Sequence, residues 1–426
     1  SAANCVTIIL VHRRCLRKDK LMEHKISLQR AQEILLPHCA PRGAEPLAIE
    51  QTYGRISARD ITARENFPAF ARSPFDGYAF IAADTFGASK SSPVTLKVVE
   101  NVPAGKVPTV ELTPGLATRI MTGAPIPVGA DAITKFEITE FTADSVTLFD
   151  EFGSGKNIIP AGEDVQAGSV LVKAGTRLIP PLVGALAAQG ITEVEVFKKP
   201  RVGIISTGSE VTPVEVPATP GKLRDSNRYT FDGALKALGC ETVFLGLVED
   251  DVAKIAALID GGRELDAIVS TGGASVGDYD FINDAFDAVG AVTLATAGKF
   301  RPGGAFAFAT LDNTLLLGLS GNPASALNTL YAVAAPAIRK LAGEADFGHT
   351  IIKVKLAEAV HNSQRVTRLM RGTLDLSDGT LNFVQHAQGN GMLTSWSGCD
   401  VIAIIPESAA NLDAGAEVEA IRMING

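Results

Sequence analysis

The chain has 426 residues, of which 46% are hydrophobic and 20% charged, and a formal net charge of −8. This length predicts two to four domains, and the acidic balance disfavours a general nucleic-acid binder, which needs a basic surface. No apolar run approaches the ~18 residues that a membrane span requires. We therefore expect a cytoplasmic protein with no nucleic acid and no membrane partner. Neither a zinc site nor a disulfide framework is indicated, because the five cysteines never show C-x-x-C spacing: Cys5, Cys15, Cys39, Cys240 and Cys399.

The N-terminal residues differ from the rest of the chain. Residues 1–21 are basic and patternless, whereas apolar residues at helical spacing begin only after Met22, so we interpret residues 1–25 as a tag or a non-native extension. Beyond it, Ser27 as an N-cap and Pro37 as a stop predict the first helix. The first elements are expected to be a helix, a strand and a helix, at 27–36, 45–50 and 53–60.

Residues 70–150 carry a different signal, short strands separated by Pro and Gly turns. We interpret them as a β module inserted into an elongated α/β segment. That segment comprises residues 26–69 and 151–199 and contains an apolar helix at 180–190. The strands of the inserted module are expected at 94–99, 116–120, 132–136 and 145–149.

Strands alternate with helices over residues 200–345, which predicts a parallel sheet covered by helices on both faces. Residues 346–426 instead alternate with period two and lack strong helices, which predicts a small β-barrel or sandwich. The alternating elements are expected at 202–206, 227–238, 242–248, 251–261, 267–270, 281–289, 314–319 and 324–341.

Three glycine turns follow strands of this α/β region, at 206–210, 272–280 and 320–325. Ligands bind at this end of the strands in open parallel sheets. The central turn holds three glycines and two acids: Gly272, Gly273, Gly277, Asp278 and Asp280. Glycines let the backbone approach an anion, and the acids would repel it unless a cation lay between them. An ordinary turn with an Asp N-cap is the alternative, but three turns together predict a metal-assisted anion site.

Other charged residues are candidates for the same site. Asp250 follows a strand, whereas Asp251 is more simply a helix N-cap. The turn at 299–304 and a basic group near Asn227 are candidates for holding oxyanions, although basic residues of an acidic protein are normally solvated. The basic group consists of Lys222, Arg224 and Arg228.

Seven motifs carry a resemblance to a known family. They are FDGYA (75–79), RIMTGAPIP (119–127), GED (162–164), STGSE (206–210), DSN (225–227), GGASVGDYD (272–280) and GLSGNP (318–323). In this order they resemble the MoeA proteins, the molybdopterin molybdenumtransferases, which are related to the C-terminal domain of gephyrin. The resemblance covers residues 26–426, and seven motifs in register make it specific.

The resemblance implies a multidomain α/β plus β fold. Its parts are a parallel three-layer α/β domain resembling the molybdopterin-binding, MogA-like fold, an inserted β module, an elongated α/β segment and a C-terminal β-barrel. It also implies an L-shaped homodimer. The implied activity is insertion of molybdate into adenylylated molybdopterin, with Mg²⁺-dependent release of AMP. Molybdopterin adenylyltransferase and molybdoenzyme apoproteins are the implied transient partners.

The matching motifs also imply site residues. The metal ligands are Asp278, Asp250 and Glu210, and the further catalytic residues are Asp76, Thr122 and Asp164. The loops of Asp76 and Thr122 are expected to reach the site from the neighbouring subunit. The residues implied to bind the pterin substrate or molybdate are Gly272, Gly273, Ser275, Gly277, Asp225, Ser226, Asn227, Arg301, Asn322, Pro323, Ser325, Arg365 and Arg371.

The chain also departs from the family pattern. Arg301 stands where a lysine is usual, Ser320 replaces a proline, and cations are missing at Ile159, Ala297 and Gly304. A lysine restored at position 304 is therefore expected to tighten molybdate binding. The losses leave two alternatives open. One is a diverged paralogue that binds or delivers molybdopterin without efficient insertion, and the other is a gephyrin-like scaffold without enzymatic activity.

Overall fold

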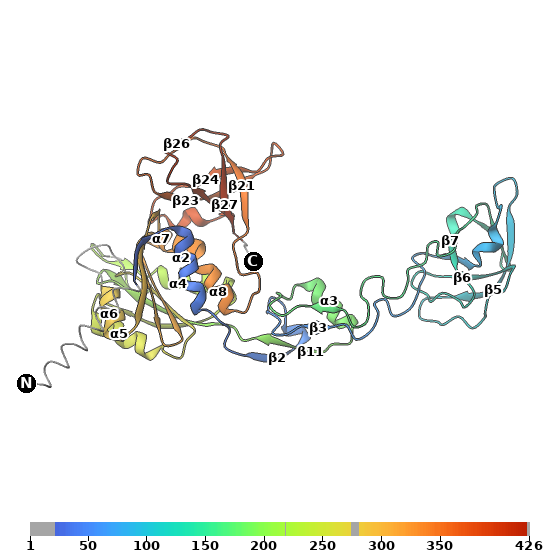
Figure 1. Cartoon of the computed structure of the whole chain (residues 1–426), viewed down its shortest axis with the longest axis horizontal. Helices are drawn as coiled ribbons and strands as arrows, with labels where there is room; N and C mark the ends of the chain where they lie inside the picture. The colour runs from blue at the N-terminus through green and yellow to red at the C-terminus, as the bar shows by residue number, and fades with distance from the viewer. Residues whose placement is uncertain (1–21, 218, 274–280, 424–426) are drawn as a thin grey trace, which may run out of the picture. The chain divides into compact units, whose positions relative to one another are not determined.

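The computed structural model describes residues 22–217, 219–273 and 281–423 (Figure 1). It divides into two compact units. Unit 1 comprises Ser1–Arg59, Ala174–Leu178 and Val194–Gly426, and unit 2 comprises Asp60–Lys173 and Ile179–Glu193. Within the described part of the chain, no helix is long and apolar enough to cross a membrane.

A seven-stranded sheet forms the centre of unit 1. Four neighbouring strands, β20, β16, β12 and β15, run parallel as the sequence predicts, whereas β19 is antiparallel to both of its neighbours. A two-residue turn, Asp312 and Asn313, joins β19 to β20, and so short a turn permits only antiparallel pairing. The sequence prediction did not include β1, β17 or β19. The strands in sheet order are β1 (Glu23–Ile26), β17 (Val292–Gly298), β19 (Phe306–Leu311), β20 (Thr314–Leu319), β16 (Ala267–Thr271), β12 (Arg201–Thr207) and β15 (Glu241–Val248).

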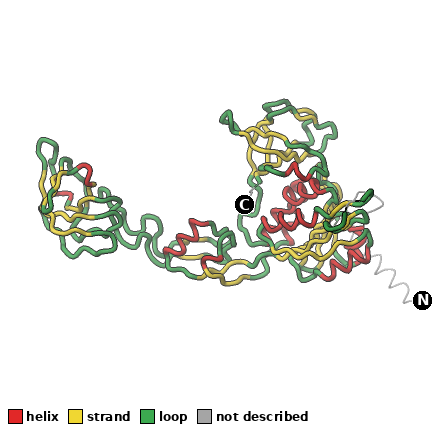
Figure 2. The backbone as a smooth tube through the Cα atoms, turned by 180° about the vertical axis from the view of Figure 1, so that it is seen from behind, coloured by secondary structure: helices red, strands yellow, loops and turns green. Residues whose placement is uncertain are grey.

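Helices cover both faces of this sheet and complete three layers (Figure 2). The Ser27 hydroxyl accepts a hydrogen bond from the backbone N–H of Arg30, so the predicted cap of the first helix is confirmed. A π-helical segment, Leu330–Ala334, interrupts the helix expected at 324–341. One face is covered by α2 (Leu28–Leu35), α4 (Asn227–Ala237), α7 (Pro323–Thr329) and α8 (Ala335–Leu341), and the other by α5 (Val252–Gly261) and α6 (Phe281–Ala288).

The C-terminal part of unit 1 is a closed barrel, as predicted. Pairing of β23 with β25 closes the ring, because each also pairs with another strand of the same sheet. The short strand β18 (Phe300–Arg301) leaves the α/β region and adds to the barrel beside β23. In ring order the strands are β23 (Thr367–Asp375), β24 (Asn382–Gln385), β21 (Ile351–Leu356), β27 (Glu417–Arg422) and β25 (Val401–Ile405).

Unit 2 contains the inserted β module, which forms one six-stranded sheet with its own buried core. Outside this sheet, β3 (Ile61–Thr62) pairs with β10 (Val170–Val172), and the predicted apolar helix is α3 (Pro180–Ala188). The strands of the module in sheet order are β7 (Ala132–Lys135), β4 (Gly77–Phe80), β6 (Leu116–Ile120), β5 (Val94–Val102), β9 (Ser145–Leu148) and β8 (Glu140–Phe141).

The helix predicted at 53–60 is wrong. Ile56 forms a β-bridge with Arg177, and Ser57 forms one with Val196. The backbone N–H of Ser57 donates to the Thr176 carbonyl oxygen at 3.0 Å, so it is unavailable to a helix. Long-range pairing has overridden a short apolar spacing that alone resembles one helical turn.

Candidate functional site

The parallel strands of unit 1 end together in polar loops. The chain passes from β12 to its neighbour β15 and then crosses to β16 on the other side of β12. Such a reversal of strand order is where open α/β sheets bind ligands, at the carboxyl ends of the strands. The glycine turns predicted to bind an anion follow β12, β16 and β20, so the fold brings their described first residues to this one edge.

Four polar side chains at this edge have atoms without a hydrogen-bond partner in the described structure. They are Ser206 Oγ, Thr271 Oγ1, Asp225 Oδ2 and Asn227 Oδ1, and we call these residues the edge cluster. Ser206 and Thr271 are paired across β12 and β16. Ser206, Thr271 and Asp225 are at most 4% exposed. Burying unpaired polar atoms is costly, so the edge cluster has the composition of a ligand site.

Asn227 links the edge cluster to the third glycine turn. Its side-chain amide donates to the Gly321 carbonyl oxygen at 2.9 Å. Asp225 is held beside it, because one carboxylate oxygen accepts from the backbone N–H of Arg228 at 3.0 Å. Ser226, the residue between them, is exposed and forms no side-chain cap. The DSN motif therefore fixes one carboxylate and one amide at the start of α4.

Gly272 is required where the loops meet. Its φ is +105°, and a Cβ atom there would lie 2.3 Å from the Thr207 carbonyl oxygen. A Cβ atom on Gly321 would lie 3.4 Å from the Cα of Gly272, so the second and third turns approach each other closely. Gly273 also has a positive φ, of +65°. Only glycine combines this conformation with so close a backbone contact.

The acids predicted to bind a metal are only partly described. Asp250 accepts a hydrogen bond from the backbone N–H of Ser209 at 3.2 Å, which brings Asp250 beside the turn that carries Glu210. Asp278, with Ser275 and Gly277, lies outside the described residues. Among the residues that are described, no group of three or more His, Cys, Asp or Glu is placed to hold a metal.

Asp251 belongs to the helix rather than to the predicted metal set. Its side chain accepts from the backbone N–H of Lys254 at 2.9 Å and caps α5. The N-cap interpretation of Asp251 is therefore confirmed.

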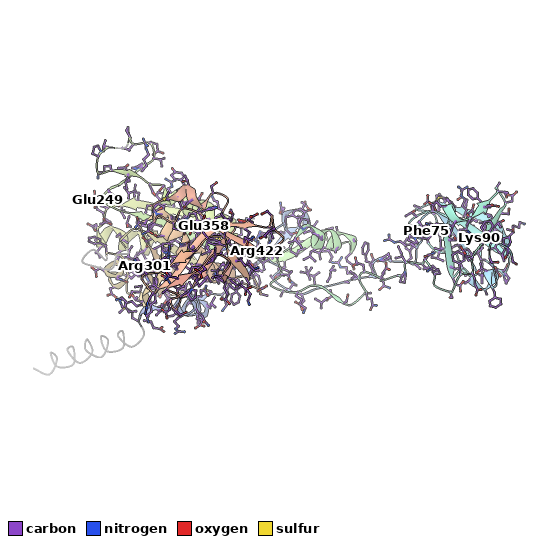
Figure 3. The ribbon with its side chains drawn as sticks, turned by 90° about the horizontal axis from the view of Figure 1, so that it is seen from above. Phe75, Lys90, Glu249, Arg301, Glu358 and Arg422 are labelled. Carbon is purple, nitrogen blue, oxygen red and sulfur yellow. The ribbon has the colours of Figure 1, made fainter. Side chains whose placement is uncertain are left out.

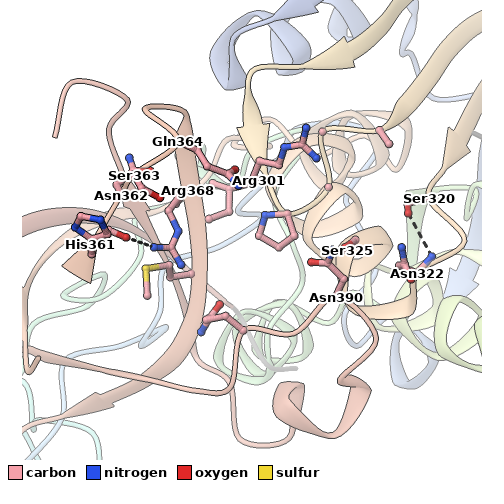
Figure 4. A pocket seen from close by; sticks show the side chains of 17 residues that line it. Arg301, Ser320, Asn322, Ser325, His361, Asn362, Ser363, Gln364, Arg368 and Asn390 are labelled. Atoms are coloured by element: carbon pink, nitrogen blue, oxygen red, sulfur yellow. Dashed lines mark hydrogen bonds between the residues drawn. The ribbon is translucent and has the colours of Figure 1, made fainter. Parts of the chain in front are cut away.

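A pocket of about 490 Å³ opens beside the edge cluster, lined by the α/β region and the barrel of unit 1 (Figure 4). We call it the arginine pocket because Arg301 and Arg368 line it. No acidic side chain is among its described lining residues. Several side chains of the predicted turns at 299–304 and 320–325 reach it. They include Arg301, Ser320, Asn322 and Ser325.

The turn at 320–322 is common to the pocket and the edge cluster. Ser320 and Asn322 line the arginine pocket, and the Ser320 hydroxyl accepts from the Asn322 backbone N–H at 3.2 Å. The residue between them, Gly321, contacts Gly272 and accepts from Asn227. Pro323 follows as the first residue of α7, which Asn322 precedes as N-cap. The edge cluster and the arginine pocket therefore share one short turn.

Two predicted arginines lie elsewhere. Arg365 is exposed and is not among the residues that line the pocket. Arg371 is fully buried, and burial lowers the pKa of its guanidinium group. It donates to the Ser395 hydroxyl at 2.6 Å and to the carbonyl oxygens of Ala387 and Gly389 at 2.6 and 2.8 Å. Arg371 thus positions the segment whose Gln388 and Asn390 line the pocket.

The glycine at position 304 has a structural reason. A Cβ atom there would lie 2.4 Å from the Phe300 carbonyl oxygen and 2.6 Å from that of Gly298. Gly304 also accepts a backbone hydrogen bond from Gly298 at 2.8 Å. The structure contradicts the expectation that a lysine here would simply strengthen the pocket, because the backbone leaves no room for a side chain.

Three predicted residues belong to unit 2. The Asp76 carboxylate accepts from the backbone N–H of Thr122 at 2.7 Å and from its hydroxyl at 2.8 Å. These hydrogen bonds, with a smaller contribution from Arg119, lower the pKa of Asp76. The third residue, Asp164, is exposed, and its backbone N–H donates to Phe67. Unit 2 thus presents a fixed, ionised carboxylate at the Asp76 turn.

Sequence reasoning missed several polar residues of the pocket. Gln388, Asn390, His361 and Arg368 line it, yet none lies in a motif. They come from the barrel and its loops, and their sequence separation from Arg301 leaves no local pattern that would have identified them.

Comparison with known proteins covers nearly the whole chain. Residues 26–190 match the MoeA N-terminal region (domain I and II), residues 203–340 a probable molybdopterin binding domain, and residues 353–423 the MoeA C-terminal region (domain IV). A molybdopterin molybdenumtransferase of Bacillus subtilis (strain 168) is 36% identical over 392 residues, which are 90% of this chain and 91% of that protein. One of Staphylococcus aureus (strain COL) is 32% identical, over 88% of this chain and 90% of that protein.

Solved structures give the same result. The molybdopterin biosynthesis MoeA protein of Pyrococcus horikoshii OT3 superposes with a TM-score of 0.80 at 28% identity, over 93% of this chain and 100% of that chain. Another solved structure, of a molybdopterin biosynthesis MoeA protein from Pyrococcus horikosii, gives a TM-score of 0.75 at 32% identity, over 93% of this chain and 99% of that chain. Fold and comparisons together define a transferase of molybdenum cofactor biosynthesis. The chain belongs to the MoeA family, as its motifs indicate.

Proposed function

We propose that this chain inserts molybdenum from molybdate into adenylylated molybdopterin and that AMP is released. The observation that carries the proposal is the turn at 320–322, which the arginine pocket shares with the edge cluster. The reaction joins two anions, a pterin bearing phosphates and an oxyanion of molybdenum. A site for each, separated by one turn, brings the reactants together and lowers the entropic barrier to their reaction.

The edge cluster supports binding of the adenylylated pterin. Its unpartnered hydroxyl groups on Ser206 and Thr271 can donate to polar ring or phosphate atoms, and the unpartnered Oδ1 of Asn227 can accept from an N–H group of the pterin. The glycine turns let the backbone approach a phosphate closely. The buried Asp225 carboxylate suits an N–H donor of the pterin rather than a phosphate.

The acids at the same edge support a magnesium site. Asp250 and Glu210, with Asp278, would hold the ion, because carboxylate oxygens are the ligands that Mg²⁺ prefers. When bound, Mg²⁺ offsets charge on the phosphoanhydride and on the departing AMP. The protein's own contribution is to orient the pterin and to hold the oxyanion in the arginine pocket.

We extend the proposal to a homodimer, in which the turn of Asp76 and Thr122 completes the site of a neighbouring subunit. The supporting observation is the ionised Asp76 carboxylate, which the Thr122 backbone and hydroxyl fix in place. Light scattering of the purified chain tests the dimer directly. A monomer at micromolar concentration would contradict it.

AMP release tests the proposed reaction. The purified chain is incubated with adenylylated molybdopterin and Mg²⁺, with or without molybdate, and AMP is measured by chromatography. We expect release only when molybdate and Mg²⁺ are both present. Tight binding of the pterin without release would support the second candidate, a protein that binds or delivers molybdopterin, which the missing cations at Ile159, Ala297 and Gly304 favour.

A further inference from the structure

The arginine pocket contains a second cation that the family pattern did not indicate. Arg301 and Arg368 are register partners in the parallel pair β18 and β23, so their side chains leave the same face of adjacent strands. Both line the pocket. Like charges on neighbouring strands destabilise a sheet unless something offsets them.

Nothing in the described structure offsets these two charges. Neither arginine forms a salt bridge with a described acid, and no described acid lines the pocket. Arg368 donates from Nη1 to the His361 carbonyl oxygen at 2.7 Å, which orients its guanidinium group (Figure 4). Its Nε and Nη2 atoms form no hydrogen bond with described residues. The hydrogen bond to the His361 carbonyl oxygen orients the guanidinium group of Arg368 but does not neutralise its positive charge.

The remaining lining suits an oxyanion. Ser320, Ser325, Asn322, Gln364 and Asn390 place neutral hydroxyl and amide groups around the two cations. Hydroxyl and amide groups donate hydrogen bonds to oxygen atoms, and arginine adds two parallel donors from one planar group. A tetrahedral dianion would therefore receive both charge and directed hydrogen bonds.

We infer that Arg368 and Arg301 together bind the oxyanion in this pocket. Arg368 thereby replaces the cations that the chain lacks at Ala297 and Gly304. The inference rests on the proposed function, which places molybdate in the pocket. Position 304 cannot carry a side chain in this backbone, so charge must enter from another element. Strand β23 supplies it from the barrel.

Oxyanion binding by the full-length chain tests the inference. Tungstate serves as the probe, since it has the charge and shape of molybdate, and its binding is followed by isothermal titration calorimetry. Arg368→Gln removes the charge but keeps a donor for the His361 carbonyl oxygen. We expect Arg368→Gln to weaken binding by about tenfold or more, because a charge-assisted hydrogen bond contributes about 1.5–3 kcal/mol and 1.4 kcal/mol is tenfold.

Arg422→Gln is the matched control. Arg422 is an exposed arginine of the same barrel and does not line the pocket (Figure 3). Its substitution should leave tungstate affinity unchanged. An equal loss in both variants would show a general effect of net charge and would overturn the role of Arg368.

Arg368→Lys separates charge from geometry. Lysine keeps one positive charge but loses the paired donors, so binding should weaken by about threefold, between wild type and Arg368→Gln. Unchanged affinity in both Arg368 variants would overturn the inference. If Arg368→Gln does not fold, Arg368→Lys decides alone: a loss of about threefold supports the inference, and wild-type affinity refutes it.

The failure of this inference can be distinguished from that of the proposed function. Tungstate binding that is equally strong with and without Arg368 leaves the function intact and assigns the oxyanion to other residues. Wild-type chain that binds neither tungstate nor molybdate in the presence of the pterin contradicts the proposed function itself.

Discussion

The edge cluster draws its polar groups from the ends of β12 and β16 and from the DSN motif at the start of α4, whereas the arginine pocket is lined by residues between 301 and 390, from both the α/β region and the barrel. In the first, glycine conformation and strand topology determine the geometry. In the second, the pairing of β18 with β23 and a buried arginine determine it. One region is therefore sensitive to local backbone changes, and the other to changes far along the chain.

Loss of Arg371 should have the largest effect on stability and should disturb the arginine pocket rather than the edge cluster. Arg371→Met removes hydrogen bonds from a fully buried guanidinium group to Ser395, Ala387 and Gly389. We expect the free energy of unfolding to fall by about 3–5 kcal/mol, since a hydrogen bond to a charged group contributes about 1.5–3 kcal/mol. Urea denaturation measures this. Arg422→Met, at the barrel surface, should change it by less than about 0.5 kcal/mol.

A substitution in the second glycine turn should disturb the edge cluster instead. Gly272→Ala forces a side chain into a φ of +105° and against the Thr207 carbonyl oxygen. We expect a loss of about 2–3 kcal/mol in stability, together with loss of pterin binding. Gly233→Ala is the control, because Gly233 lies in α4 with open space around it and alanine should stabilise that helix by about 0.5–1 kcal/mol. Equal effects of the two substitutions would contradict the assigned role of Gly272.

A lysine at position 304 tests whether the pocket accepts charge from that turn. Gly304→Lys places a Cβ atom against the carbonyl oxygens of Phe300 and Gly298. We expect a destabilisation of about 1–3 kcal/mol, as for other overpacked sites, and no gain in tungstate affinity. Thermal unfolding and calorimetry measure the two quantities. Tighter binding in a fully stable variant would show that the turn can rearrange.

The smallest effect on stability is expected at the start of α5. It tests which of two neighbouring acids beside the edge cluster takes part in the reaction. Asp251→Ala removes a helix cap and should cost about 1 kcal/mol of stability, without changing the rate of AMP release. Its neighbour provides the contrast, since Asp250→Asn should reduce release strongly while stability is kept. A large loss of release in Asp251→Ala would assign a metal role to that carboxylate after all.

The sequence was sufficient for the elements with local signals. Ser27 and Asp251 could be predicted as helix N-caps because serine and aspartate are preferred at that position. The glycine turns could be predicted because they follow strands that short apolar runs indicate. Strand β19 was missed, because its antiparallel direction depends on the turn at Asp312 and Asn313 and its residues lack alternation. The prediction of a helix at 53–60 was wrong because this segment forms β-bridges with residues 177 and 196.

The candidate site shows the same division. The DSN motif and the glycine turns of the edge cluster lie where sequence order places them, at strand ends. Arg368 could not be found in this way, because its partner Arg301 is 67 residues away and only the register of β18 with β23 joins them. The buried position of Arg371 is likewise set by barrel closure rather than by any local pattern.

The shared turn at 320–322 has a thermodynamic consequence. Gly321 meets the edge cluster, while Ser320 and Asn322 face the arginine pocket, so a ligand that shifts the turn on one side changes the free energy of binding on the other. Linkage makes such coupling reciprocal: whatever factor the pterin applies to the dissociation constant of the oxyanion, the oxyanion applies to that of the pterin. Two titrations, performed in opposite order, must therefore close the same thermodynamic cycle.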